Sequence, residues 1–161
     1  MFKYKDPLPE NPFCKWTERI SGAAGIDAEE LARSLGASVV EHMETQCSIA
    51  VSAQYDDIQT GGLLSKKVQP GILFKFTERS NYCGFLVGLN KVAGILEVAI
   101  VQHGSPSAGM QRLNVAESKG AFSVGGALRK AVTDTAAVEE ERMYYSALNQ
   151  TIQDIVESWI E

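Results

Sequence analysis

The sequence predicts an α+β fold: an antiparallel sheet of about four to five strands, with a central meander at 71–103, covered by an N-terminal helix and a long C-terminal helix. Three observations support this prediction. Residues 71–103 contain three apolar runs separated by two short polar turns. Apolar residues recur at every fourth position within 28–45, and an apolar seam with helical spacing runs through 134–160.

The length of 161 residues is that of one domain. We expect a single α+β domain at 14–161, preceded by an extended N-terminal arm at 1–13. Pro7, Pro9 and Pro12 exclude a helix and a central strand from this arm. The arm either packs on its own domain as a strap or reaches a neighbouring subunit, and both interpretations stay open.

The net charge of −5 is concentrated in one part of the chain. Residues 134–161 contain seven acidic side chains and a single basic one, Arg142. A net negative chain disfavours binding to nucleic acid, which depends on neutralising phosphates. No apolar run reaches the roughly 18 residues that a membrane span needs, and the N-terminal residues lack the apolar core of a signal peptide. We therefore expect neither a nucleic-acid partner nor a membrane.

Three widely spaced cysteines, Cys14, Cys47 and Cys83, form neither a disulfide framework nor a metal-binding CxxC motif. Free thiols are typical of a reducing compartment, so we expect the protein to be cytoplasmic. Nucleophile, phosphate-loop and metal motifs such as GxSxG, GxGxxG and HExxH are absent from the sequence. We expect no cofactor and no metal, and nothing in the sequence favours enzymatic activity.

The first predicted helix spans about 28–45, after a short helical turn expected at 15–20. Asp27 is a suitable N-cap, and Glu30 completes a capping box. One apolar face follows at spacings of four: Leu31, Leu35, Val39 and Met43. Gly36 costs about 1 kcal/mol relative to alanine inside a helix. The helix either continues through Gly36 or ends there, with a strand opening at Val39.

Residues 47–55 alternate apolar and small polar side chains, which predicts a half-buried strand. A loop is expected at 56–67. The meander follows as three antiparallel strands, at about 72–77, 82–89 and 95–103. Their turns are expected at Arg79–Asn81 and at Asn90–Lys91, because asparagine tolerates a left-handed backbone.

A loop of small residues at 104–109 leads into a short helix predicted at 110–118, and residues 120–126 are either a strand or a loop. The long C-terminal helix at 134–160 carries a seam of six apolar residues: Val138, Tyr145, Leu148, Ile152, Ile155 and Trp159. This seam either covers the core of its own domain or pairs with another subunit, since a seven-residue recurrence also suits a helix dimer.

One loop has the composition of a ligand site. It comprises His103, Ser105, Ser107, Gly109 and Arg112 at the predicted start of the short helix. Small residues let a ligand approach the backbone, and the free N–H groups of a helix N-terminus attract anions. This loop therefore either caps the helix or binds a small anionic ligand such as a phosphate-bearing or nucleotide-like molecule.

These patterns favour a non-enzymatic cytoplasmic binding or assembly protein that acts as a homo-oligomer through its N-terminal arm and long helix. The alternative is a small-molecule binder that uses the loop at 103–112. A further alternative is a small inhibitor protein from a mobile element that binds a larger host machine. The expected partners are other copies of this chain, a second protein or a small anionic ligand.

Overall fold

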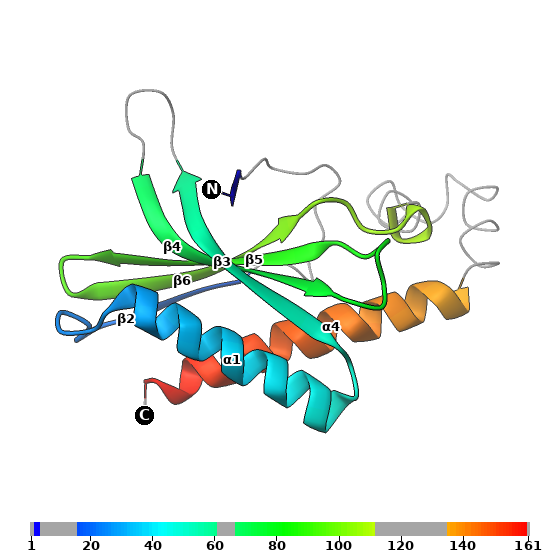
Figure 1. Ribbon diagram of the computed structural model, residues 1–161, viewed down its shortest axis with the longest axis horizontal. Helices are drawn as coiled ribbons and strands as arrows, with labels where there is room; N and C mark the ends of the chain where they lie inside the picture. The colour runs from blue at the N-terminus through cyan, green and yellow to red at the C-terminus, as the bar shows by residue number, and fades with distance from the viewer. Residues whose placement is uncertain (1, 4–15, 61–66, 112–134, 161) are drawn as a thin grey trace, which may run out of the picture.

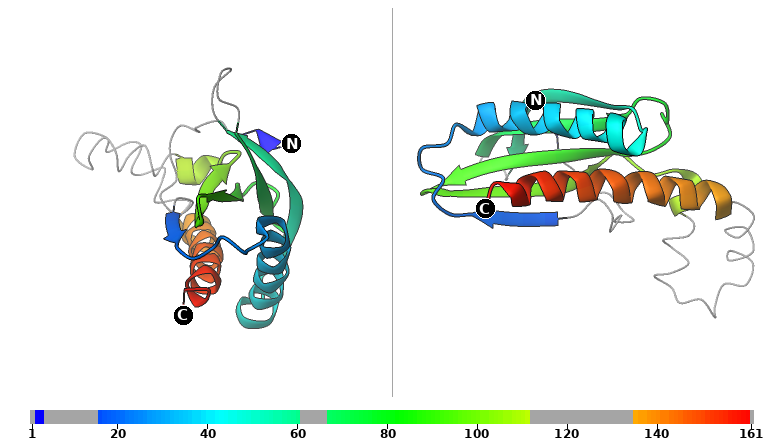
Figure 2. Two further views of the ribbon diagram at one scale, coloured as in Figure 1. Left: turned by 90° about the vertical axis from the view of Figure 1, so that its left-hand side faces the viewer. Right: turned by 90° about the horizontal axis from the view of Figure 1, so that it is seen from below.

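A computed structural model describes residues 2–3, 16–60, 67–111 and 135–160. Within these residues, six strands form one sheet in the order β1-β3-β4-β5-β6-β2, and two helices lie side by side on one face of it (Figures 1 and 2). The helices run in opposite directions along that face. The predicted α+β fold, with an antiparallel sheet and a helix near each end of the chain, is confirmed.

The strands are β1 (Phe2–Lys3), β2 (Trp16–Ile20), β3 (Val51–Thr60), β4 (Lys67–Phe76), β5 (Gly84–Val92) and β6 (Ile95–His103). The helices are α1 (Ala28–Cys47) and α4 (Thr135–Ser158). Strands β3 to β6 follow one another as an antiparallel meander. Within the described residues, no helix has both the length and the apolar composition needed to cross a membrane.

The helical turn that we expected at 15–20 is wrong, because Trp16–Ile20 form strand β2. Its residues pair antiparallel with β6, from Trp16 opposite Ile100 to Ile20 opposite Leu96. Ile20 is buried in the core, whereas Arg19 points to the other face and binds the carboxylate of Glu97 at 3.0 Å. The pairing with a distant strand therefore overrides the weak local preference of this segment.

Helix α1 runs unbroken from Ala28 to Cys47, so the predicted alternative that ended it at Gly36 is wrong. The N-cap prediction is confirmed, because the Asp27 carboxylate accepts hydrogen bonds from the N–H groups of Glu29 and Glu30. The helix ends at Ser48, which adopts a left-handed conformation with φ of 56°. Tertiary packing of the apolar face on the sheet explains how the helix tolerates an internal glycine.

Several predicted strand boundaries differ from those in the structure. Strand β3 extends through Thr60 into the expected loop at 56–67, and β4 begins at Lys67. The tip of the β5–β6 hairpin lies at Ala93–Gly94 rather than at Asn90–Lys91. Both tip residues have positive φ, 51° and 79°, which suits the tight two-residue turn of a twisted hairpin.

The main core lies between the sheet and the two helices. Its largest fully buried side chains come from every layer: Tyr145, Phe74, Phe85, Leu35, Met43, Ile72, Leu89, Leu96, Ile100, Met110 and Leu148. In the predicted α4 seam, Val138, Tyr145, Leu148 and Ile152 are buried in this core. Ile155 and Trp159 are half-buried against it. The seam therefore covers the core of its own chain.

The opposite face of the sheet carries a smaller apolar cluster of Ile58, Leu73 and Leu86, with Phe2 packed against it. Phe2 belongs to β1, which pairs in parallel with Ile58 and Gln59. These two residues of the predicted arm thus pair with their own chain, and residues 4–13 lie outside the described part.

Two acidic side chains cap backbone N–H groups on the outermost antiparallel strands of the sheet. In β2, the Glu18 carboxylate accepts the N–H of Arg19 at 3.0 Å. In β3, the Asp56 carboxylate accepts the N–H of Asp57 at 2.7 Å. Strand β2 is an edge of the sheet, whereas β1 pairs with the outer side of β3. The Glu18 cap therefore withholds an edge-strand donor from a second chain.

The cap on β2 can be removed without touching the core. We expect Glu18→Val to promote concentration-dependent self-association, because the variant frees an edge donor and removes an edge charge. Size-exclusion chromatography with light scattering measures this directly. Glu18→Gln is the matched control, since it keeps an acceptor oxygen and should behave like the wild type. Unchanged association of Glu18→Val would contradict the capping role.

Candidate functional site

The loop predicted as a ligand site begins where β6 ends. The ring of His103 packs edge-on against Phe2, with the ring centroids 6.5 Å apart. Burial lowers the pKa of His103 below its ordinary value, and the positive charge of Lys75 lowers it further. The imidazole is therefore mostly uncharged at neutral pH. A neutral imidazole attracts an anion less strongly than the charged one that an anion site would use.

Ser107 caps the helical turn that follows. Its hydroxyl oxygen accepts the N–H of Met110 at 3.2 Å, and its own N–H donates to the Glu141 carboxylate at 3.0 Å. Ser105 is exposed and Gly109 lies in the turn, whereas Arg112 lies outside the described residues. The structure thus uses Ser107 in an internal contact with α4. Binding of a small anion to this loop stays a prediction.

A buried polar network anchors α4 to the sheet. The Tyr145 hydroxyl donates to the Glu141 carboxylate at 2.6 Å and accepts the N–H of Cys83 at 3.0 Å. Burial raises the pKa of Tyr145 well above its usual range, and the neighbouring Cys83 thiol and Glu141 carboxylate raise it further. The phenol therefore remains protonated and serves as a donor. Glu141, one of the seven acidic residues of 134–161, is only 1% exposed.

Removal of the Glu141 carboxylate should destabilise the fold. We expect Glu141→Ala to lower the free energy of unfolding by about 1–3 kcal/mol, because it leaves the donors of Tyr145 and Ser107 unpaired. Both donors bind the same carboxylate oxygen, Oε2. Glu141→Gln retains an oxygen for them and should lose less. Urea denaturation measures both, and equal losses in the two variants would show that charge alone matters.

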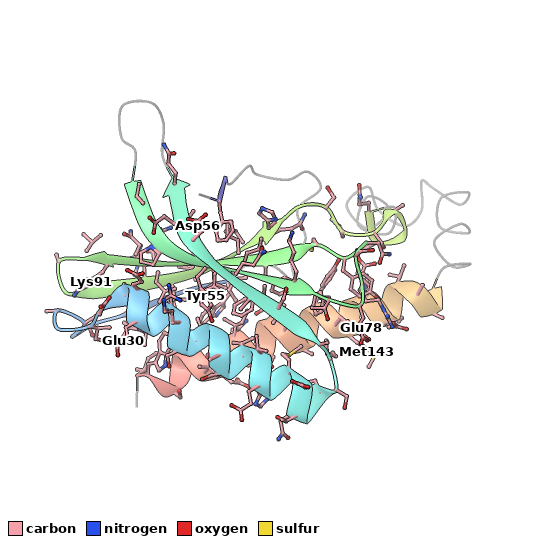
Figure 3. All side chains as sticks on the ribbon, in the orientation of Figure 1. Glu30, Tyr55, Asp56, Glu78, Lys91 and Met143 are labelled. Atoms are coloured by element: carbon pink, nitrogen blue, oxygen red, sulfur yellow. The ribbon has the colours of Figure 1, made fainter. Side chains whose placement is uncertain are left out.

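The structure also contains a small open pocket, of about 60 Å³, that the sequence did not indicate. We call it the notch. It lies between the first half of α1 and the β3–β4 ribbon, where β3 crosses the helix near Tyr55 (Figure 3). Its lining residues are Glu29, Ala32, Arg33, Tyr55, Asp56, Asp57, Pro70 and Gly71. The notch thus combines the carboxylates of Glu29 and Asp57, one guanidinium group and one aromatic ring. The Asp56 side chain points to the other face of β3, because successive side chains of a strand alternate.

Gly36 provides the space in which the Tyr55 side chain lies. A Cβ atom at Gly36 would overlap the phenol oxygen and would lie 2.8 Å from the ring carbons Cε1 and Cζ. The Tyr55 hydroxyl donates to the backbone oxygen of Arg33 at 3.4 Å. Tyr55 is nevertheless 37% exposed, so the helix accommodates it as a wall of a surface pocket rather than as part of the core.

The guanidinium group of Arg33 lies over the Tyr55 ring, with its Cζ 5.1 Å from the ring centroid. The same guanidinium approaches the Glu29 carboxylate at 3.9 Å. Both charged side chains are largely exposed, at 62% and 74%. Exposed ion pairs of this kind contribute little to stability, so the arrangement can open at small cost.

A substitution at Gly36 tests this account of Tyr55. Gly→Ala inside a helix ordinarily stabilises by about 1 kcal/mol. We expect Gly36→Ala to lose most of this gain, because the new methyl group overlaps the far end of the exposed Tyr55 side chain and displaces it. In a Tyr55→Ser background the same substitution should give the full gain of about 1 kcal/mol. Thermal unfolding of the four proteins in this cycle gives the answer, and additive effects would contradict the steric account.

The sequence signal for the notch was Gly36, which we interpreted only as a weak point in α1. Comparison with known protein families, curated proteins and solved structures gives no match. Among the residues that the structure describes, no group of three or more His, Cys, Asp or Glu side chains could hold a metal ion.

Proposed function

We propose that this protein is a non-enzymatic binding protein and that the notch is where it holds its partner. The observation that supports this most is the placement of Tyr55. A glycine inside α1, which costs about 1 kcal/mol relative to alanine, makes room for a side chain that stays 37% exposed. Sequences keep such local costs mainly where a site requires them.

The chemistry of the notch fits recognition. Its described side chains provide charge and an aromatic face, which are features that orient and hold a ligand. Its two walls are a helix and a pair of long antiparallel strands, so the site sits on regular elements. A site on regular elements is held in place before the partner arrives, which lowers the entropy cost of binding.

We further propose a cytoplasmic location, supported by Cys47 and Cys83, neither of which forms a disulfide bond. Homo-oligomerisation stays a prediction. The α4 seam that suggested it is buried in the core of its own chain, so assembly requires other surfaces. Ligand binding at 103–112 and the inhibitor hypothesis also stay predictions.

Selection from a random peptide library displayed on phage tests the binding function. The immobilised protein should enrich peptides whose binding is lost in Ala32→Trp, which fills the notch. Binding should persist in Ala136→Trp, a matched substitution at an exposed position near the start of α4. A failure to enrich any peptide, or enrichment that Ala32→Trp leaves unchanged, would contradict the proposal. Circular dichroism checks that both variants fold.

A further inference from the structure

We propose that the group recognised in the notch is an arginine side chain from a partner polypeptide. This inference rests on the proposed binding function and specifies its ligand. It is carried by the charge of the notch, by the contacts of the internal Arg33 and by the exposed strand beside the site.

The charge of the notch favours a cation. Glu29 and Asp57 contribute two negative charges and Arg33 contributes one positive charge, which leaves a net of −1. Asp56 is not counted, because successive side chains of a strand point to opposite faces and its carboxylate already accepts the N–H of Asp57. A concave site lined mainly by one sign of charge concentrates the potential and attracts the opposite charge. The Asp57 carboxylate lies within an exposed stretch at 54–57, so an incoming group can reach it.

Arg33 shows which chemistry the site accepts. Its guanidinium group stacks over Tyr55, 5.1 Å from the ring centroid, and lies 3.9 Å from the Glu29 carboxylate. This is the combination of an aromatic face and a carboxylate that binds arginine in protein interfaces. Since the Arg33 side chain is 62% exposed, a partner's arginine can displace it from the ring without exposing buried apolar surface.

Arginine fits this site better than lysine. A planar guanidinium can lie flat on the Tyr55 ring and still direct N–H groups to carboxylates at its edges, whereas an ammonium group acts as a point charge. The exposed residues 54–57 run along the outermost antiparallel strand beside the notch. They provide further contact surface for the residues that flank the arginine. A polypeptide therefore gains contacts here that a free amine does not.

The test uses a capped five-residue peptide with a central arginine and glycine and serine on either side. A second peptide carries citrulline, which has nearly the same shape without the charge. Titration is followed by ¹H–¹⁵N correlation spectra of the full chain. We expect shifts at Tyr55, Arg33 and Gly71, and an affinity for the arginine peptide at least about tenfold higher than for the citrulline peptide.

Two variants of the notch should move the affinity in opposite directions. Asp57→Asn should weaken binding of the arginine peptide about threefold, as expected for an exposed ion pair. Arg33→Ala should strengthen it about threefold, because it removes a competing cation from the Tyr55 ring. Arg19→Ala is the control, since it makes the same charge change on the opposite face, beside Glu97, and should leave the affinity unchanged.

Equal affinity for the arginine and citrulline peptides would overturn the inference, as would weaker binding in Arg33→Ala. The phage selection separates the two proposals. If peptides that depend on the notch lack basic residues, the inference about arginine fails while the binding function stands. If no peptide depends on the notch, the binding function itself fails.

Discussion

Both helices pack on the same face of the sheet, so the side chains that β4, β5 and β6 direct toward them fill a space from which water is excluded. Phe76 lies within that space and contacts four other rings, those of Tyr82, Phe85, Tyr144 and Tyr145. Tyr145 also brings a hydroxyl group into the core. A buried hydroxyl must be hydrogen-bonded, and Glu141 and the N–H of Cys83 satisfy it. The Glu141 carboxylate of α4 thus hydrogen-bonds the hydroxyl group that Tyr145 brings into this aromatic cluster.

Periodicity explains which parts of the fold the sequence could predict. Apolar residues recur with the period of a helix in the α4 seam and with the period of strands in the meander. These periods can be recognised in the sequence without knowing which elements pack together. Strand β2 has no such signal, because Trp16–Ile20 is too short for a pattern and takes its structure from β6. The hairpin tip differs from the prediction for a related reason. Cross-strand pairing continues to Val92 opposite Ile95, so only Ala93 and Gly94 form the turn.

The site was harder to predict than the fold. The sequence directed attention to Ser107 and its small neighbours, but the capping contact and the Glu141 carboxylate already engage that turn. The notch is made by three separate segments, 29–33, 55–57 and 70–71, and none of them forms a motif. The sequence shows Gly36 inside the predicted helix, but a glycine can occur in a helix for many reasons. Only the position of the Tyr55 ring shows which cause applies here.

The chain order of β2 has a consequence for synthesis in the cell. Trp16 precedes its partner Ile100 by 84 residues, so the ribosome makes β2 first and its pairing strand much later. At roughly 5–20 residues per second, β2 waits roughly 4 to 17 s for β6 to be made. During that interval Trp16 and Ile20 have no β6 to pack against. The acidic Glu18 between them then acts as a solubilising residue for a nascent segment, well before it has a sheet edge to cap.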